Sequence, residues 1–293
     1  MVSPELESVI KNSLSLSLSK PVGSLEFRPV GGGSINTSYQ LKVDKEHLFF
    51  CKINSISPFP GLFEKEKKGL ELLGSHPLIR VPRVIASNIA ENKQILILEW
   101  IDQGIKSEKF WKLFGEQLAN LHRVSNDFFG LEEDNYMGAL HQSNHPAKEW
   151  TGFLIRERFN PQISLALKKN LLEASHANRF GNLFKNIHNI FPAEIPSLLH
   201  GDLWSGNFLC DETGLPVLID PAVYFGHRSM DLGMTTLFGG FDEEFYDSYQ
   251  YHFPFPNNYR EQWDVCNLYP LLIHLNLFGR SYLSDILHTL RRY

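Results

Sequence analysis

Residues 200–220 read HGDLWSGNFLCDETGLPVLID, and this stretch contains most of what the sequence indicates about the fold. Two short apolar runs flank the turn-forming sequence DETG at 211–214, which predicts a β-hairpin. If the strands pair symmetrically about the last two residues of that turn, Asn207 and Asp220 become cross-strand partners at the open end. Opposite residues in such a pair have Cβ atoms roughly 4.5–5.5 Å apart. Asp202 stands just upstream of the hairpin.

The three polar residues around the hairpin have the chemistry of a phosphoryl-transfer site. The amide oxygen of Asn207 and the carboxylate of Asp220 can hold a hard divalent cation, while Asp202 can orient a hydroxyl group. An aspartate, then an asparagine ligand, then an aspartate ligand is the order found in kinase-type phosphotransferases. The alternative is ordinary turn chemistry, because Asp-Gly and Asp-Pro pairs are common in turns. The apolar pair Leu198-Leu199 just before the loop favours a loop that leaves a buried segment.

Length, composition and charge exclude several classes of protein. The chain has 293 residues, of which 43% are hydrophobic, so it can form one large domain or two modest ones with packed cores. The formal net charge is −5 and no Lys/Arg-rich run occurs, which argues against a nucleic-acid partner. The three cysteines are widely spaced and have no metal-ligand pattern. No secretory leader or membrane-spanning run is visible, so we expect a cytoplasmic protein without a membrane partner.

The pattern along the chain predicts an α+β fold of two lobes. The first hundred residues alternate like strands around a single helix, and the pattern becomes helical beyond residue 104. We therefore expect an N-terminal β-rich lobe at 1–103, a hinge at 99–104 and a mainly helical lobe at 104–293. The stretch SLSLSLS at 13–19 alternates like a strand, although a frayed segment would fit equally well. The expected strands are 25–30, 37–43, 47–53, 84–88 and 94–100, and the expected helices are 62–73, 110–123 and stretches of 148–190 and 261–292.

Two features of the predicted small lobe suit the phosphates of a nucleotide. Gly31, Gly32, Gly33 and Ser34 lie between two expected strands, where glycines let backbone N–H groups approach phosphates closely. This is not a Walker loop, because no GKS or GKT follows and the next element is a strand. Lys52 stands in an otherwise apolar strand, where a buried ammonium needs a counter-charge. The alternative for Lys52 is an edge-strand lysine whose ammonium reaches water.

The predicted helix at 62–73 supplies a counter-charge for Lys52. At 100° per residue its apolar residues form one stripe, and Glu66 falls in the middle of that stripe. Glu64 lies off the stripe. The periodicity therefore predicts that Glu66, and not Glu64, pairs with Lys52.

The apolar strand at 95–101 runs into the expected hinge. In a kinase architecture its last residues, Glu99, Trp100 and Ile101, offer backbone C=O and N–H groups to the adenine edge. Any buried strand can look like this, so the interpretation depends on the motifs on either side.

The chain resembles the fructosamine kinases, or ketosamine-3-kinases, which are relatives of the aminoglycoside phosphotransferases with a protein-kinase-like fold. The resemblance covers nearly the whole chain, and LLHGDLWSGN at 198–207 is its most specific part. Aminoglycoside and choline kinases share the HGD…N skeleton, whereas LWSG at 203–206 is similar to the fructosamine group. Other matching stretches are GGGSINTSYQL at 31–41, FFCKIN at 49–54, FEKEKKGLELL at 63–73, VPRVI at 81–85, LILEWI at 96–101, LANLHR at 118–123, FGLEEDNYMGAL at 129–140, IDPAVYFGHRSMDLGM at 219–234, LFGGFDEEFYDSY at 237–249 and HLNLFG at 274–279.

The resemblance implies ATP- and Mg²⁺-dependent phosphorylation of the sugar 3-hydroxyl of ketosamines, the adducts formed when amines are glycated. The 3-phosphate is unstable and is lost, so the family is regarded as a deglycation or metabolite-repair system. By position, the resemblance makes Asp202 the catalytic base and Asn207 and Asp220 the Mg²⁺ ligands. Lys52 and Glu66 would hold the phosphates, and 99–101 would line the adenine site.

The remaining candidates concern the substrate and the support of the loop. Trp204 can present an apolar face to the sugar or its amine, or it can anchor the loop in the core. His227 is expected in the same substrate site, and Asp231 is expected to hydrogen-bond the catalytic loop as a structural brace. Many relatives carry cysteine where Ser34 stands, so a thiol switch at this position is not expected.

Two other functions stay open at this stage. One is a phosphotransferase for another hydroxylated amine, such as an aminoglycoside or a choline-like compound. The other is a nucleotide-binding pseudokinase that serves as a scaffold, although all the expected catalytic positions are present. The preferred partner is a small ketosamine or glycated amine.

Overall fold

The computed structural model describes residues 2–31 and 36–293 and divides into two compact units. The first unit contains the residues up to Ser107 together with Leu209–Ile219, and the second contains Glu108–Phe208 and Asp220–Tyr293. The predicted boundary assigned all of 104–293 to one domain. Leu209–Ile219 instead folds with the first unit, because backbone bonds tie this hairpin segment to residues 80 and 104.

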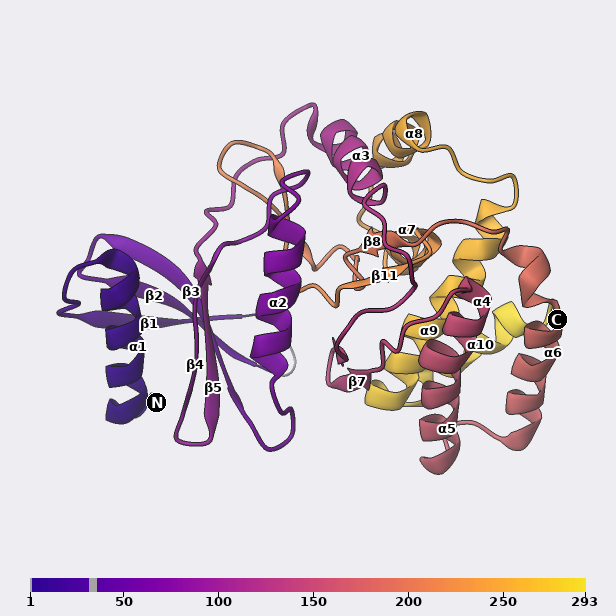
Figure 1. Ribbon diagram of the computed structural model, residues 1–293, viewed down its shortest axis with the longest axis horizontal. Coiled ribbons are helices and arrows are strands. Elements are labelled where there is room, and N and C mark those ends of the chain that lie inside the picture. The colour runs from indigo at the N-terminus through magenta and orange to yellow at the C-terminus, as the bar shows by residue number, and fades with distance from the viewer. Residues whose placement is uncertain (1, 32–35) are drawn as a thin grey trace. The chain divides into compact units, whose positions relative to one another are not determined.

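A five-stranded antiparallel sheet forms the centre of the first unit (Figure 1). Its strand order is β1-β2-β3-β5-β4, so neighbours in sequence mostly pair directly. This is the small antiparallel sheet that the alternating sequence predicts. The register sets Lys52 opposite Leu96. The strands are β1 (Leu25–Val30), β2 (Thr37–Val43), β3 (His47–Ser55), β4 (Val84–Ala90) and β5 (Lys93–Glu99).

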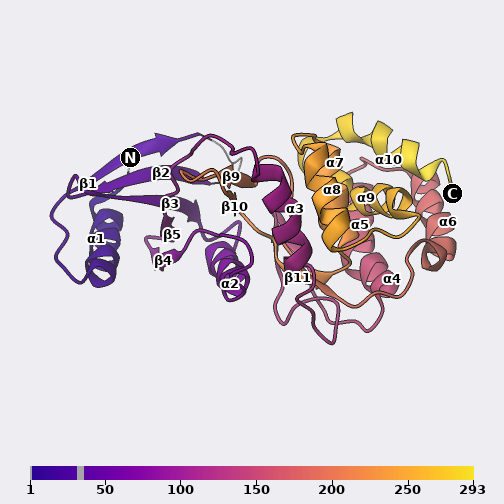
Figure 2. The ribbon, with the colours of Figure 1, turned by 90° about the horizontal axis from the view of Figure 1, so that it is seen from above.

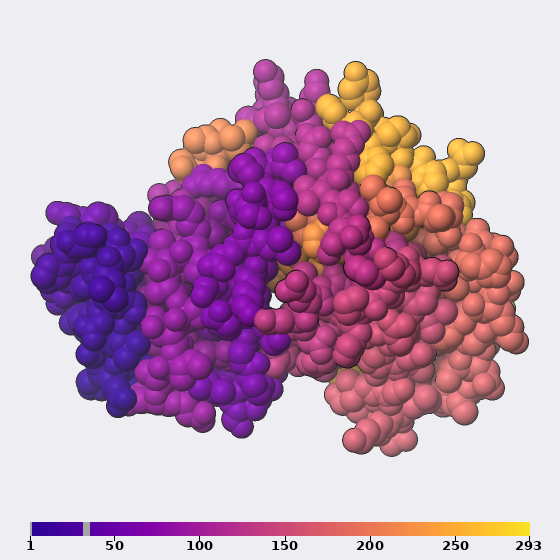
Figure 3. Space-filling view, viewed as in Figure 1, coloured from indigo at the N-terminus to yellow at the C-terminus, as the bar shows by residue number. Residues whose placement is uncertain are grey.

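Helices α1 (Pro4–Leu18) and α2 (Leu62–Gly74) lie on opposite sides of β4 and β5 in both ribbon views (Figures 1 and 2). Alternate residues of a strand point to opposite faces. Cys51 and Ile97 belong to the apolar cluster that contains the buried side chains of α1. Lys52 therefore points to the face that carries α2. In the space-filling view the indigo atoms of α1 are at the surface (Figure 3).

The helix α1 corrects two expectations, the strand-like or frayed segment at 13–19 and a small lobe with a single helix. Ser3 caps α1 by accepting a hydrogen bond from Leu6 N, and Pro4 occupies the first turn, where its missing N–H is not needed. Leu6, Ile10 and Leu14 repeat every four residues and are buried, whereas Leu16 is exposed. The Ser-Leu alternation is therefore incidental, and packing on the sheet selects the helix.

The second unit is mainly helical and has its own apolar core. Helices α3 and α8 pack against each other, as do α7 and α9 (Figure 2). The long helical stretch expected at 148–190 is broken into shorter helices with a π-helical turn at Leu154–Phe159. The helices are α3 (Phe110–Leu121), α4 (Trp150–Phe153), α5 (Asn160–Lys168), α6 (Ala174–Ile190), α7 (Ser229–Leu237), α8 (Glu243–His252), α9 (Tyr259–Phe278), the 3₁₀ turn η2 (Arg280–Tyr282) and α10 (Leu283–Leu290).

Three short antiparallel ribbons complete the fold. Two of them lie in the second unit and pair β6 with β7 and β8 with β11. The third pairs β9 with β10 and is the hairpin predicted from the sequence. Within the described part of the chain, no helix has both the length and the apolar character of a membrane span. The strands are β6 (Asn135–Met137), β7 (Leu140–Gln142), β8 (Ser197–Leu199), β9 (Phe208–Cys210), β10 (Pro216–Leu218) and β11 (Tyr224–Gly226).

Candidate active site

The loop at 200–207 leaves the buried strand β8 through a turn that only glycine fits. Gly201 has a φ of +84°, which side chains disfavour, and a Cβ atom there would lie 2.1 Å from the carbonyl oxygen of Ala222. The amide of Ala222 donates to the carbonyl of His200 over 2.9 Å. The glycine therefore lets the loop lie directly against the chain that follows Asp220.

Asp231 holds the start of this loop through hydrogen bonds to its backbone. Its side chain is buried, and its two oxygens accept hydrogen bonds from the amides of His200, at 2.7 Å, and Gly201, at 2.9 Å. The Nε2 atom of His122 lies 3.2 Å from the same carboxylate, and Nδ1 of that ring lies 2.8 Å from the hydroxyl of Tyr249. A buried carboxylate needs such partners, and together they form the brace that the sequence suggests for Asp231.

Asp202 and Asn207 are in direct contact. Nδ2 of Asn207 donates to the backbone oxygen of Asp202 and to its Oδ2, both over 2.9 Å. Burial raises the pKa of Asp202 to about 7; the hydrogen bond from Asn207 opposes this shift, while the negative charges of Asp220 and Asp231 add to it. Near neutral pH this carboxyl group can therefore take up or release a proton, as a general base must.

Asn207 and Asp220 carry oxygen atoms of the kind that could hold Mg²⁺. Because the amide nitrogen of Asn207 is turned to Asp202, the amide oxygen is left to point elsewhere. Asp220 has a left-handed backbone with a φ of +54°, which ends the hairpin, and its charge acts on Asp202. Mg²⁺ prefers a few oxygen ligands and keeps several waters.

The hairpin that joins Asn207 to Asp220 closes in a register one residue away from the predicted one. The Asp211 amide donates to the Leu215 carbonyl over 2.9 Å, so the turn is centred on Thr213. Oδ1 of Asp211 accepts hydrogen bonds from the amide and hydroxyl of Thr213 and from the Leu215 amide. The Asp211 side chain thus makes hydrogen bonds to the turn residues that backbone carbonyl groups would make in a symmetric hairpin.

An arginine that the sequence did not single out anchors this hairpin. Arg80 lies 2.5 Å from Oδ2 of Asp211 and 3.0 Å from Oε1 of Glu99. Its carbonyl accepts a 2.9 Å hydrogen bond from the amide of Leu218, on β10. Arg80 therefore links the end of β5 to the turn of the hairpin and to β10 within the first unit. The only signal in the sequence was an arginine in a short apolar run, and its partners lie far along the chain.

Lys52 and Glu66 form the ion pair predicted from the helical stripe. Their side chains are 3% and 10% exposed, and Nζ lies 2.7 Å from Oε1. Glu64 is at the surface, 3.4 Å from Lys67. The two glutamates are two positions apart on α2, which places them on different faces of the helix. Periodicity alone therefore selected the correct partner, while the role of the pair in binding phosphates stays a prediction.

The other nucleotide candidates are placed only in part. Gly32, Gly33 and Ser34 lie outside the described residues. Ile101 is buried, and Nε1 of Trp100 donates to Asp102 over 2.9 Å. The Glu99 carboxylate is held by Arg80 and accepts a hydrogen bond from the Arg83 amide, and the Glu99 amide donates to the Arg83 carbonyl over 2.9 Å, so the adenine contact expected at Glu99 stays a prediction. Gly31 has open space where a side chain would stand.

The two substrate candidates have opposite surroundings. Trp204 is a partly exposed residue of the loop, but His227 is buried between the rings of Trp150 and Phe191. Nε2 of His227 lies 3.1 Å from the Glu194 carboxylate, and burial lowers the pKa of the ring to about 4. The substrate contact predicted for His227 is therefore not supported. His227 is therefore a buried residue that packs just before α7. The local sequence gives no pattern that would distinguish it from an exposed histidine.

The architecture has solved counterparts among enzymes that phosphorylate small molecules. A thermostable mutant of the aminoglycoside phosphotransferase APH(4)-Ia matches with a TM-score of 0.58 and 11% identity, covering 96% of this chain and 98% of that one. This similarity concerns the fold. It defines the architecture as a kinase-like phosphotransferase fold with two units.

Closer relatives identify the family. A family model described as fructosamine kinase matches residues 6–293. "Probable ketoamine kinase" of Lactiplantibacillus plantarum is 37% identical over 270 residues, which cover 92% of this chain and 94% of that protein. "Protein-ribulosamine 3-kinase, chloroplastic" of Arabidopsis thaliana is 35% identical over 269 residues, covering 90% and 81%. A crystal structure from Thermobifida fusca, described as a fructosamine-3-kinase, has a TM-score of 0.85 and 28% identity, covering 96% and 97%.

The chain belongs to the fructosamine kinase family. It is a kinase that uses ATP to phosphorylate a hydroxyl group.

Proposed function

We propose that the chain transfers the γ-phosphoryl group of ATP to the 3-hydroxyl of a ketosamine, a sugar joined to an amine by glycation. The contact between Asp202 and Asn207 in the loop at 200–207 carries the proposal, because it joins a carboxyl group of raised pKa to an amide that can face a cation. The names of the relatives support the acceptor, since they are called ketoamine and ribulosamine kinases. The 3-phosphate product is unstable, so the reaction would free the amine and serve deglycation.

In this proposal Asp202 accepts the proton of the attacking hydroxyl. The carboxylate orients the hydroxyl group and takes its proton late, because phosphoryl transfer relies mainly on positioning and electrostatics. Asn207 and Asp220 would hold Mg²⁺, whose positive charge neutralises the phosphate oxygens as the bond to the leaving group breaks. That charge also favours the ionised form of Asp202 and so offsets its raised pKa. A neighbour of the same fold was solved with AMP-PNP and Ca²⁺.

The nucleotide would be held by residues of the first unit. Lys52, oriented by Glu66, would contact the phosphates, and the backbone groups at Gly31–Ser34 would cover them. Backbone groups at 99–101 would bind the adenine edge. The ion pair supports this role because a buried lysine paired with a glutamate on a helix has its ammonium group held in position.

The test is a substrate panel with purified protein and MgATP. ADP release is measured with fructosyl- and ribulosyl-amines, an aminoglycoside and choline, and ³¹P NMR locates the phosphate on the sugar. We expect turnover only with the ketosamines and a phosphate on carbon 3. Asp202→Asn should remove it while leaving the protein folded. Turnover with an aminoglycoside but with no ketosamine would refute the proposal, and nucleotide binding without any turnover would favour a scaffold.

A further inference from the structure

Five aromatic side chains form a continuous strip on the second unit, beginning in the catalytic loop. Ring centroids lie 5.9 Å apart between Trp204 and Phe238, and 5.0 Å apart between Phe238 and His274. His274 in turn lies 5.5 Å from Phe278 and 5.0 Å from Tyr282. We call these five residues the aromatic strip. Two of the stretches shared with the family, LFGGF and HLNLFG, supply its middle.

The strip is joined to the loop by close backbone contacts. A Cβ atom on Gly206 would lie 2.3 Å from the ring of Trp204, so the indole lies over the backbone of its own loop. A Cβ atom on Gly240, two residues after Phe238, would lie 2.5 Å from the side chain of Ser205. Both glycines therefore allow contacts that a side chain would prevent. They hold Trp204 and the end of α7 against the segment that contains Asp202.

Much of this aromatic surface faces solvent. Trp204 is 37% exposed, Phe238 is 40% exposed and Phe278 is 54% exposed. Nδ1 of His274 lies 2.7 Å from the Pro270 carbonyl, an acceptor, so the ring is fixed with its proton on that nitrogen. Burial also lowers the pKa of His274, which keeps the imidazole neutral. The strip is thus an uncharged row of ring faces and edges, a surface suited to apolar and aromatic groups.

We propose that the aromatic strip binds the amine substituent of the ketosamine and selects aromatic or aliphatic amines over polar ones. This rests on the proposed function. In a ketosamine the amine nitrogen is on carbon 1, two carbons from the hydroxyl that Asp202 would deprotonate. A substituent on that nitrogen therefore extends from the sugar at a point close to the catalytic loop, where Trp204 is the first residue of the strip. The protonated nitrogen can also lie over the indole face, within about 6 Å of its centroid.

The experiment compares ketosamines that share fructose and differ in their amine. The amines are methylamine, lysine joined through its side-chain nitrogen, hexylamine and benzylamine. For the wild type we expect kcat/KM to be at least about tenfold higher for the benzyl than for the methyl compound, since burying a ring removes a large apolar surface from water. Phe278→Ala and Phe238→Ala should each lower this benzyl-to-methyl ratio by about fivefold, mainly through KM.

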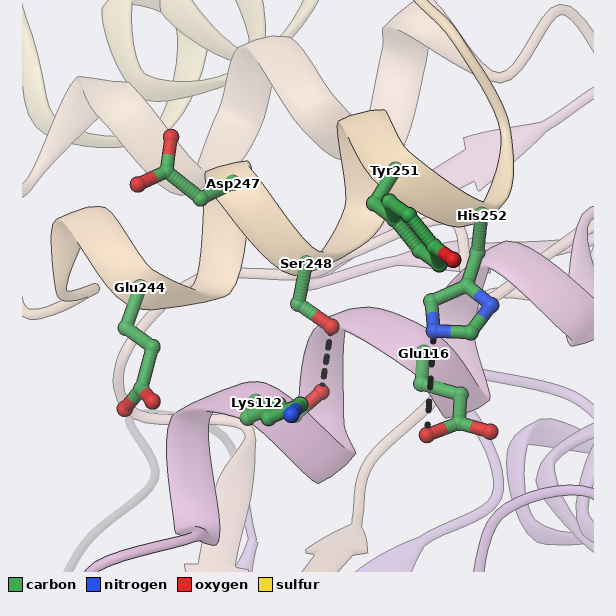
Figure 4. Close-up of a pocket in the computed structure, with 7 residues that line it drawn as sticks. All are labelled: Lys112, Glu116, Glu244, Asp247, Ser248, Tyr251 and His252. Atoms are coloured by element: carbon green, nitrogen blue, oxygen red, sulfur yellow. Dashed lines mark hydrogen bonds and ion pairs between the residues drawn. The ribbon is translucent and has the colours of Figure 1, made fainter.

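Tyr251→Ala is the matched control. Tyr251 is 83% exposed on α8 and belongs to a different surface, a groove of about 500 Å³ (Figure 4). Figure 4 shows its ring beside His252, on the helix that faces Lys112 and Glu116 of α3. Removing this ring takes away a similar aromatic area and should leave the benzyl-to-methyl ratio unchanged.

The outcomes separate the two proposals. If the wild type phosphorylates no ketosamine, the proposed function fails and the strip proposal fails with it. If it phosphorylates all four ketosamines, but the strip variants keep the wild-type ratio, only the strip proposal is wrong. Calorimetric binding of the benzyl compound without ATP provides a second measurement, and we expect affinity to weaken about fivefold in Phe278→Ala. Thermal unfolding of each variant excludes a folding defect, since the substituted rings are half exposed.

Discussion

Lowering the pH from about 7.5 to about 5 should remove much of the stability that the neutral His227 ring contributes, while protonation of Asp202, whose pKa is raised to about 7, acts in the opposite direction. Burial lowers the pKa of this ring from 6.5 to about 4, outweighing the attraction of Glu194. Between these values the unfolded chain binds a proton that the folded chain does not. Stability from this group is therefore complete above the unfolded pKa of 6.5 and falls as the pH drops toward 4. At 1.36 kcal/mol per pKa unit, the total is about 3 kcal/mol, of which about 2 kcal/mol is lost by pH 5.

The structure explains why the ring stays neutral. The amide of Ser229 lies 3.2 Å from Nδ1 of His227, so this nitrogen is the acceptor and the proton is on Nε2, facing Glu194. A second proton would therefore have to enter at Nδ1, where an N–H group already points. Urea denaturation at a series of pH values measures the effect, and Trp150 is a suitable fluorescent reporter because its ring packs against His227.

The variant His227→Gln should unfold more easily at neutral pH but lose about 2 kcal/mol less stability than the wild type on acidification. His188→Gln is the matched control, because His188 is exposed on α6, and we expect it to keep the wild-type slope. Identical pH slopes for the wild type and His227→Gln would refute the reasoning. The same variant tests the original substrate assignment: at about pH 8, a raised KM for the ketosamine with unchanged stability would restore His227 to the substrate site.

Three further substitutions test the division of roles in the site. Asp202→Asn should lower kcat by about 10²–10⁴-fold while ATP affinity, measured with a fluorescent nucleotide, stays within about twofold; a parallel loss of affinity would contradict its role as a base. Glu66→Gln should weaken ATP binding by about tenfold, because the lysine loses its charged partner, whereas Glu64→Gln should not, and equal effects would exclude the stripe argument. Arg80→Met should raise the Mn²⁺ concentration needed to form the ternary complex with an ATP analogue by about three- to tenfold, followed by electron paramagnetic resonance. Arg83→Met is its control, and no change in Arg80→Met would show that the hairpin positions its ends without the arginine.

The parts of the structure that the sequence predicted are those set by local periodicity. The five strands of the first unit and α2 follow from alternation and from a helical stripe, which are properties of a few neighbouring residues. The Lys52–Glu66 pair follows for the same reason, because each residue's face is fixed by its own element. To predict this pair from the sequence, only one long-range assumption was needed, namely that two buried side chains of opposite charge contact each other.

The parts that failed depend on tertiary packing. Residues 13–19 alternate like a strand, but the face that buries Leu14 is chosen by the sheet and not by the segment itself. His227 lies in a polar sequence and is nevertheless enclosed by Trp150 and Phe191, which are far from it in the chain. The pairing of Arg80 with Asp211 spans 131 residues, so no pattern within either segment could indicate it.

The hairpin between Asn207 and Asp220 shows why the metal ligands cannot be understood from residues 200–220 alone. Strands of three residues are too short to be stable by themselves. Here the strands are held by backbone bonds from Leu218 to Arg80 and from Gly104 to Cys210. The hairpin whose two ends lead to the proposed Mg²⁺ ligands is therefore held by residues of the first unit. Arg80→Met should for this reason act on metal binding although Arg80 is not one of the proposed ligands.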